Sequence, residues 1–400
     1  MKHVQVLGAG ECGLPLARRL LDGGMPVTLV ADRSAEAILS GSVTSTQVKF
    51  PYTLDLEAAA GLGHWRSTAP EIKGIRFNLV VERNAIAGWS GHFGRPAQSV
   101  DQRTVFARWI TDFLAAGGDL QITDLSLEDV DRRAAEYDLT VVTRASRDLA
   151  ACFPDDPAWT VPAAPQRQLS VLYLDGVQPE QDDLGTYVAL PELGELVSYP
   201  GLTGQPGRER RCEMLLFAAK PGRELDVFSP LSTSVERLRQ TKELLERYLP
   251  AAFADRYRDA ELTDSGATLV GGVTPVMRQP IGTLPSGRLV LGGADIVCRM
   301  DPSGAQGANN AVHCGIHYGN TILDNPDGPY DRDWMHATAA PWLADIAHPA
   351  ARWTTALLDP PPAMQRLMLT AALEVALADS FADTFARPAN MSTFLAGAES

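Results

Sequence analysis

Three glycines near the start of the chain constrain its fold more than any other feature. Gly8, Gly10 and Gly13 follow a short apolar run at residues 3–7, and a helical stretch then leads to a second apolar run at residues 27–30. We expect Gly8 to form the tight turn, Gly10 to let the backbone approach a pyrophosphate, and Gly13 to let the helix pack closely on its strand. The pattern predicts a dinucleotide-binding βαβ unit.

The polar groups at the two ends of this unit indicate where the dinucleotide would lie. The free N–H groups at the helix N-terminus, together with the positive end of the helix dipole, favour a phosphate. Asp32 follows the glycines by about twenty residues, the usual distance to the acid that binds a ribose hydroxyl. The motif therefore predicts an adenine dinucleotide, and by itself it does not separate FAD from NAD.

Composition narrows the class of protein. With 400 residues, 45% of them hydrophobic, the chain can bury a large core and divide into two or three packed units. The net charge is −14 and there is no basic run, which argues against a nucleic-acid partner. The sequence shows no apolar stretch of membrane-spanning length and no secretory signal. Its five cysteines lack C-x-x-C spacing, so we expect free thiols in a cytoplasmic protein.

Helix and strand patterns alternate along the first part of the chain. A helical stretch at 103–116 and apolar runs at 120–122 and 139–142 extend the nucleotide-binding domain. Between about 165 and 275 the pattern changes to strands separated by turns rich in Gly, Pro and Asp, which predicts a mostly antiparallel sheet on the substrate side. One helix interrupts this region, beginning with a capping box at 233–236.

A second glycine-rich segment lies near residue 300. An apolar strand ends close to Asp295, and the loop at 301–310 opens a helix. We expect Asp295 to bind a ribityl or ribose hydroxyl and the loop N–H groups to face a ligand. For a flavin that target is the N1–C2=O edge, where a helix N-terminus stabilises the charge of the reduced form. The alternative is an ordinary glycine turn that caps a buried helix.

With these two motifs in place, the chain resembles the styrene and indole monooxygenases, which are FAD-dependent epoxidases of two-component systems with a p-hydroxybenzoate hydroxylase-like fold. Supporting segments lie at 99–103, 137–142, 194–197, 271–275, 351–354 and 382–385. The resemblance implies an α/β chain with a Rossmann-type FAD-binding domain, an inserted mostly antiparallel substrate domain and C-terminal helices. The expected boundaries are 1–160 and 276–330 for the FAD-binding domain, 161–275 for the substrate domain and 331–400 for the helices.

The resemblance also implies an activity. Reduced FAD from a partner flavin reductase would react with O₂ to give a C4a-peroxyflavin, which epoxidises or hydroxylates a small aromatic or olefinic substrate such as a styrene or an indole. The chain has one G-x-G-x-x-G motif and no evident counterpart of the mid-chain Asp-Gly motif of single-component hydroxylases, which favours a separate reductase. A homodimer is a further expectation. Two alternatives stay open: a self-sufficient NAD(P)H-dependent hydroxylase or reductase of this fold, and a non-catalytic flavin-binding protein.

Site residues follow from the same resemblance. Ser45 and Thr46 stand where the family has an Asn-Thr pair beside the isoalloxazine, and with Pro302 they are the candidate catalytic residues; for Thr46 the alternative is a turn hydroxyl. Ala305 stands where a glycine is common. No metal site is expected. The candidate FAD-binding residues are Gly8, Gly10, Gly13, Asp32, Arg33, Arg103, Asp295, Pro302, Gly304, Ala305, Gln306, Gly307 and Asn309.

Overall fold

The first apolar run forms strand β1 (Val4–Leu7), which lies inside a largely parallel sheet. The computed structural model describes residues 2–396, and in it β1 pairs in parallel with β2 (Val27–Ala31) on one side and with β6 (Leu139–Val142) on the other. The sheet has six strands in the order β14-β15-β6-β1-β2-β5. Its remaining strands are β5 (Asp119–Ile122), β14 (Ile281–Thr283) and β15 (Leu289–Gly292). The expected Rossmann-type architecture is confirmed, and residues near 290 return to complete its sheet.

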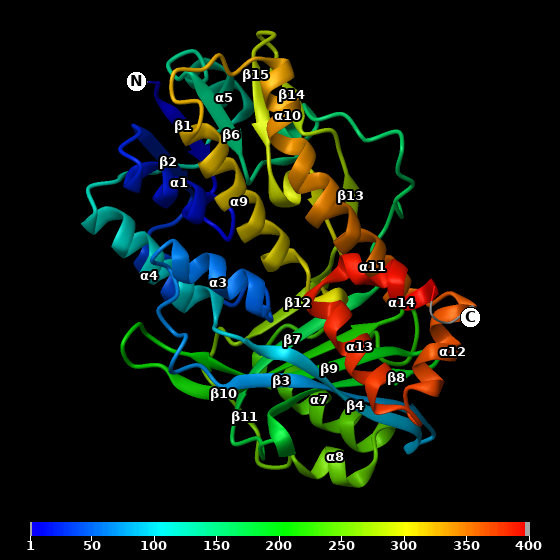
Figure 1. Cartoon of the computed structure of the whole chain (residues 1–400). Helices are drawn as coiled ribbons and strands as arrows, with labels where there is room; N and C mark the ends of the chain where they lie inside the picture. Colours follow the sequence, from blue (N-terminus) through cyan, green and yellow to red (C-terminus); the bar gives the residue numbers. More distant parts are fainter. Residues whose placement is uncertain (1, 397–400) are drawn as a thin grey trace.

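Helices pack against this sheet, and two of them approach each other closely. A Cβ added to Gly315 of α9 would lie 2.3 Å from the carbonyl oxygen of Cys12, which directly precedes α1. Figure 1 shows α1 and α9 running beside the first sheet, with α3 and α4 between it and the second sheet. The helices of this part are α1 (Gly13–Asp22), α2 (Ala35–Leu39), α3 (Pro51–Ala59), α4 (Gln102–Ala115), α5 (Leu127–Arg133), α6 (Arg147–Ala150) and α9 (Gly307–Leu323).

The second sheet has eight strands in the order β11-β7-β10-β9-β8-β3-β4, with β12 also paired to β7. All of its pairings are antiparallel except that of β3 with β8, in agreement with the predicted mostly antiparallel sheet. β3 and β4 come from residues before 161, so the sheet extends beyond the expected substrate-domain boundaries. The strands are β3 (Glu71–Val81), β4 (Asn84–Gln98), β7 (Gln168–Asp175), β8 (Leu184–Leu190), β9 (Gly194–Thr203), β10 (Arg210–Ala219), β11 (Glu261–Leu262) and β12 (Thr268–Gly272).

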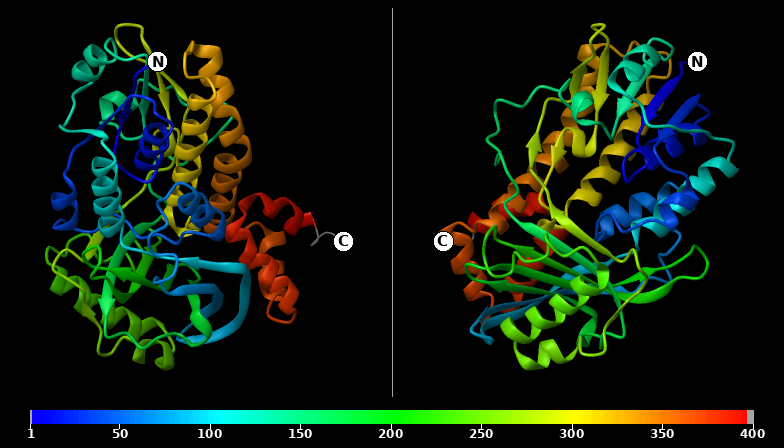
Figure 2. Two further views of the ribbon diagram at one scale, coloured as in Figure 1. Left: turned by 60° about the vertical axis from the view of Figure 1, so that its left-hand side comes forward. Right: turned by 180° about the vertical axis from the view of Figure 1, so that it is seen from behind.

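Helices cover both faces of the second sheet (Figure 2). On one face α7 (Ser234–Tyr248) begins with the predicted capping box, in which Thr233 Oγ1 accepts from the Glu236 N–H and the Glu236 carboxylate accepts from the Thr233 N–H; α8 (Ala251–Asp255) follows it. On the other face, aromatic side chains of the C-terminal helices pack against the sheet core. The C-terminal helices are α10 (Arg332–Trp342), α11 (His348–Leu358), α12 (Pro362–Thr370), α13 (Val375–Ala386) and α14 (Met391–Ala396).

A buried charge cluster joins the glycine loop to the helices beneath it. Lys49 Nζ lies 2.8 Å from Glu11 Oε2, pairs also with the Glu57 carboxylate of α3, and sits 4.6 Å from the ring centroid of Trp109 in α4. The side chains of all three charged residues are less than a tenth exposed. Burial raises the pKa of Glu57 to about 7 despite the attraction of Lys49. Both buried carboxylates therefore depend on the single Lys49 ammonium group to balance their negative charge.

Lys49→Met should destabilise the fold strongly. The substitution leaves two buried carboxylates without their cation, and the loss of one partner from a buried pair costs about 3 kcal/mol in the free energy of unfolding. Denaturant unfolding monitored by circular dichroism measures the change. Lys73→Met is the matched control, because Lys73 is exposed and pairs with Asp183 at the surface, so its unfolding midpoint should stay close to that of the wild type. Equal midpoints for the two variants would contradict the role assigned to the cluster.

Candidate functional site

The glycine loop between β1 and α1 has the form that a dinucleotide requires. Gly8 has φ +111°, a conformation that L-residues with a side chain rarely adopt. A Cβ on Gly13 would lie 1.8 Å from the Gly8 carbonyl oxygen, so this position requires a glycine. A Cβ on Gly10 would meet no described atom within 4 Å. The space over Gly10 is therefore open to a ligand, and the first turn of α1 provides N–H groups beside it.

Two of the residues expected to bind the cofactor, Asp32 and Arg33, contact each other just after β2. Asp32 forms ion pairs with Arg144 and with Arg33, whose Nε lies 3.6 Å from the carboxylate. Partial burial acts to raise the pKa of Asp32, but the hydrogen bond and charge of Arg144 lower it overall. The carboxylate is therefore ionised at neutral pH and can accept a hydrogen bond from a ribose hydroxyl.

Asp295 lies in the turn after β15, where the sequence places it. The residue is solvent-accessible, and yet protein atoms surround it so densely that desolvation raises its pKa to about 6. The preceding Ala294 has φ +49°, which marks a tight turn. An accessible carboxylate at this turn can accept a hydrogen bond from a ligand hydroxyl.

The segment from Asp301 to Gly307 forms the predicted loop before α9. Asp301 accepts a hydrogen bond from the Ser303 N–H at 2.9 Å and so starts a single 3₁₀ turn at 302–304. Ala305 has φ +55°. This left-handed conformation favours glycine, so the alanine here adopts a backbone conformation that residues with a side chain rarely take. A Cβ on Gly307 would meet no described atom within 4 Å, so the N-terminus of α9 also faces open space.

Three further candidates are occupied by contacts within the protein. The Gln306 amide donates to the Gly304 and Phe385 carbonyl oxygens, both at 2.9 Å. The Asn309 side chain accepts from the Phe50 N–H at 3.0 Å and donates to the Val48 carbonyl at 2.8 Å. A Cβ on Gly304 would lie 2.5 Å from Thr354 Oγ1. These residues hold the loop in place, and the described contacts of both amide side chains are with protein groups.

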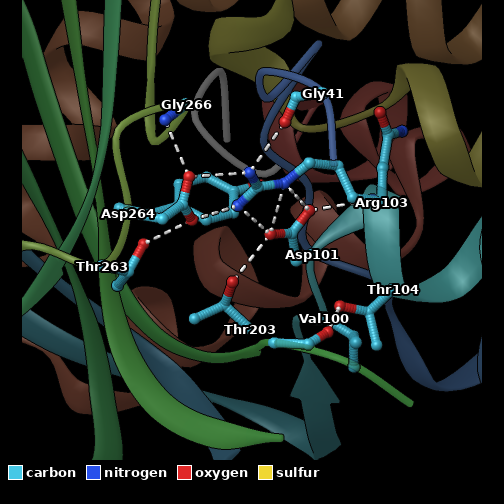
Figure 3. Close-up of polar contacts among 12 residues, drawn as sticks. Gly41, Val100, Asp101, Arg103, Thr104, Thr203, Thr263, Asp264 and Gly266 are labelled. Atoms are coloured by element: carbon cyan, nitrogen blue, oxygen red, sulfur yellow. Dashed lines mark hydrogen bonds and ion pairs between the residues drawn. The ribbon is translucent and has the colours of Figure 1, made fainter. Parts of the chain in front are cut away.

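Arg103 is likewise surrounded by protein acceptors (Figure 3). Its Nε and one terminal nitrogen donate to Asp101, both terminal nitrogens donate to Asp264, and one also donates to the Gly41 carbonyl oxygen. A guanidinium has five N–H groups, and these contacts account for all of them. The Asp101 carboxylate also accepts a hydrogen bond from Thr203 Oγ1 at 2.7 Å. Arg103 thus fixes the start of the segment that leads to Ser45 and Thr46.

A cavity lies between the second sheet and the loop before α9. Pro302, Ser303 and Ala305 of the loop form one wall, and Thr46 contributes to another. Ser45 is set back from it by backbone contacts, since its carbonyl oxygen accepts from Tyr173 OH at 2.9 Å. The other lining residues come mainly from the sheet and are Gln47, Val48, Phe50, Ile72, Gly74, Ile75, Phe93, Gly185, Thr186, Tyr187, Val197, Tyr199, Leu216 and Phe385.

No lining residue of this cavity carries a formal charge, and most are apolar or aromatic. Thr46 Oγ1 and Tyr199 OH are hydrogen-bonded at 2.6 Å, and burial raises the pKa of Tyr199, so the phenol stays neutral. Neither Tyr199 nor Gln47 was among the residues that the sequence predicted for the site. Alternating side chains on strands 184–190 and 194–203 indicated which residues share a face, but not which face meets the flavin loop.

Other polar clusters point to no metal centre among residues 2–396, where no group of three or more His, Cys, Asp or Glu side chains has metal-binding geometry. Of the two histidines on α9, His317 Nε2 bonds the Thr338 carbonyl at 2.8 Å, and burial lowers the pKa of His313 to about 4. No helix in the described part of the chain is long and apolar enough to cross a membrane.

Comparison with known proteins supports the expected family. Residues 146–256 match a family model described as the styrene monooxygenase A putative substrate binding domain. The styrene monooxygenase StyA of Pseudomonas fluorescens is 26% identical over 403 residues, covering 97% of this chain and 93% of that protein. The StyA of another Pseudomonas species gives the same identity and coverage.

Solved structures show the same fold over nearly the whole chain. A flavoprotein/dehydrogenase from Cytophaga hutchinsonii superposes with a TM-score of 0.71 at 13% identity, covering 100% of this chain and 96% of that one. The p-nitrophenol 4-monooxygenase PnpA from Pseudomonas putida gives 0.63 at 13% identity, with 97% and 98% covered. The flavin-dependent brominase Bmp2 gives 0.65 at 10% identity, with 100% and 99% covered. The matched segment and the curated relatives make the chain similar to styrene monooxygenases, and together with the fold they support an FAD-dependent monooxygenase.

Proposed function

We propose that the protein is the oxygenase of a two-component system, which takes reduced FAD from a partner flavin reductase and uses O₂ to epoxidise or hydroxylate a small aromatic or olefinic compound, such as a styrene or an indole. The observation that carries the proposal is the uncharged, largely apolar cavity that ends at the loop before α9. Such a cavity suits a hydrocarbon-like substrate and lacks the cation that an aromatic acid would need.

Different residues would bind different parts of FAD. The N–H groups around Gly10 and the start of α1 would bind the diphosphate, and Asp32 and Asp295 would accept hydrogen bonds from sugar and ribityl hydroxyls. The N–H groups of Gln306 and Gly307, at the start of α9, would face the N1–C2=O edge, with Pro302 against the ring. This helix end would stabilise the negative charge of a reduced flavin there.

The residues around the cavity position the substrate and exclude water. Bound reduced FAD supplies the activation of O₂ and the transfer of one oxygen atom. The Thr46 hydroxyl, oriented by Tyr199, would give a polar contact at the reacting edge of the ring. The apolar walls from the second sheet keep water away, which protects the reactive form of the cofactor from decomposition. A separate reductase suits the single G-x-G-x-x-G unit, which FAD itself would occupy.

The proposal is tested by comparing two routes of reduction. NADH or NADPH added alone to the FAD-loaded protein should leave the absorbance of oxidised flavin unchanged for as long as a self-sufficient hydroxylase would need for many turnovers. An unrelated flavin reductase added with NADH, O₂ and styrene or indole should give an oxygenated product, detected by gas or liquid chromatography. Rapid bleaching by NAD(P)H alone would indicate a self-sufficient enzyme. Formation of hydrogen peroxide alone would indicate a protein that binds flavin without oxygenating these substrates.

Gly10→Ala and Gly13→Ala should separate cofactor binding from folding. The Gly10→Ala side chain enters open space, so the melting temperature of the FAD-free protein should stay unchanged while FAD affinity falls about tenfold or more, roughly 1.4 kcal/mol. Gly13→Ala collides with the Gly8 carbonyl, so both the melting temperature and the affinity should fall. Differential scanning fluorimetry and FAD fluorescence titration measure the two effects. Unchanged FAD affinity in Gly10→Ala would place the diphosphate elsewhere.

FAD binding should weaken as the pH falls through about 6. The Asp295 carboxyl has a pKa near 6 without ligand, and a ribityl hydroxyl donating to the carboxylate would lower that pKa, so binding releases a proton and is favoured above this pH. FAD dissociation constants at pH 5, 6 and 7.5 measure the effect. Asp295→Asn should bind FAD more weakly at pH 7.5 and should lose most of this pH dependence. A wild-type pH profile that Asp295→Asn reproduces would exclude Asp295 from the cofactor site.

A further inference from the structure

Arg144 is a cation that the glycine motif does not predict, and its side chain begins directly over the glycine loop. A Cβ added to Gly8 would lie 2.8 Å from the Arg144 Cβ and 2.7 Å from Thr143 Oγ1. The N–H groups of Thr143 and Arg144 both donate to the Leu7 carbonyl oxygen, at 2.9 and 3.1 Å. The segment that follows β6 is therefore fixed against the turn that follows β1.

The charged end of the Arg144 side chain reaches the end of another strand. Its guanidinium forms an ion pair with the Asp32 carboxylate, just after β2. Strands β6, β1 and β2 are parallel neighbours in this order, so the side chain spans the carboxyl end of β1. Dinucleotides bind outside the carboxyl ends of the strands in sheets of this kind. Arg144 thus borders the space between the glycine loop and Asp32, where the adenosine diphosphate half of FAD would lie.

The charges around Asp32 do not balance. Arg33 Nε lies 3.6 Å from the same carboxylate, so two guanidinium groups face one carboxylate and leave a surplus positive charge. The chain as a whole carries a net charge of −14. A local positive surplus in an acidic protein, placed beside an expected phosphate site, favours an anionic ligand there.

Most of the hydrogen-bond donors of Arg144 are free for a ligand. The side chain is 60% exposed, and within residues 2–396 the Asp32 carboxylate is the partner of its guanidinium. A guanidinium presents five N–H donors in a planar fork that fits phosphate oxygens, and one carboxylate occupies only part of this fork. The competing interpretation is an exposed ion pair that contributes little beyond orienting Asp32.

We propose that Arg144 is a cofactor-binding residue, whose guanidinium holds Asp32 with one part of its fork and donates from the rest to the diphosphate of FAD. The inference rests on the proposed placement of FAD along the glycine loop. It goes beyond the motif, in which backbone N–H groups and the helix dipole stabilise the diphosphate. It also makes the preference for FAD over riboflavin, which lacks the diphosphate, depend on a charged side chain.

Four ligands that each carry part of FAD, or all of it, test this contact. ADP contains the diphosphate and adenosine does not, and FAD and riboflavin differ in the same way. Isothermal titration calorimetry on the FAD-free protein measures the four dissociation constants, with no catalysis required. Arg144→Gln should weaken ADP and FAD about tenfold, as expected for the loss of a hydrogen bond between charged groups, and should leave adenosine and riboflavin unchanged. Arg144→Lys keeps the charge without the fork, so it should weaken ADP less than Arg144→Gln.

Arg147→Gln is the matched control. Arg147 begins α6 only three residues after Arg144, is also exposed, and has no ion-pair partner within residues 2–396. This variant removes the same charge from the same segment and should keep all four wild-type dissociation constants. Melting temperatures of the FAD-free variants show that each one is folded.

The pattern across the ligands decides between the interpretations. Equal weakening of ADP and adenosine in Arg144→Gln would show that Arg144 only orients Asp32 toward the ribose. Tighter adenosine binding would show that Arg144 competes with the ribose for Asp32. Either result, or an unchanged ADP affinity, would overturn the diphosphate contact.

Failure of the proposed function would give a different result. Product formation by the wild type with a flavin reductase, NADH and O₂ is followed in parallel. A selective loss of ADP and FAD affinity in Arg144→Gln, without any oxygenated product from the wild type, would keep the contact of Arg144 and overturn the monooxygenase reaction. A wild type that forms product while Arg144→Gln keeps its ADP affinity would do the reverse.

Discussion

The arrangement of the site depends on one ionic network, in which the Arg103 guanidinium binds Asp101 and Asp264. Arg103 belongs to α4 of the nucleotide-binding part, whereas Asp264 follows β11 of the second sheet. Thr203, which donates a hydrogen bond to Asp101, ends β9. The same guanidinium holds the Gly41 carbonyl oxygen. Helix α4, the second sheet and the segment that leads to Thr46 therefore meet at one side chain. Because the cation compensates two carboxylates, each contact depends on the others, and loss of one would leave a charge without its partner.

The loop before α9 is shaped by packing from the end of the chain. Thr354 of α11 lies so close to Gly304 that this position has no room for a side chain, and the Gln306 amide bonds the Phe385 carbonyl of α13. The C-terminal helices thus stabilise a loop in which Ala305 adopts a left-handed conformation that disfavours a side chain. Open space beyond Gly307 leaves the N-terminus of α9 available to an anionic group.

The cavity is built from segments that lie far apart in the chain. Its walls come from β3, β8 and β9, from the loop before α9, and from residues 46–48 and Phe50. A largely apolar wall distinguishes ligands weakly, by size and shape. The buried cluster of Lys49 with its two glutamates lies next to Gln47 along the chain, and it anchors this segment against the glycine loop from the other side.

The sequence by itself determined the βαβ unit, its glycine loop, the loop before α9, the capping box at Thr233 and the mostly antiparallel sheet, because each depends on local spacing that folding preserves. The family resemblance correctly extended these elements to the fold and the enzyme class. Tertiary structure alone decided that β3 and β4 join the second sheet, since strand pairing over such distances depends on packing. It also decided that Arg103, Gln306 and Asn309 bond protein groups, and that Gln47 and Tyr199 meet the cavity. Their partners lie far away in the chain, and only the closed fold shows which donors and acceptors come together.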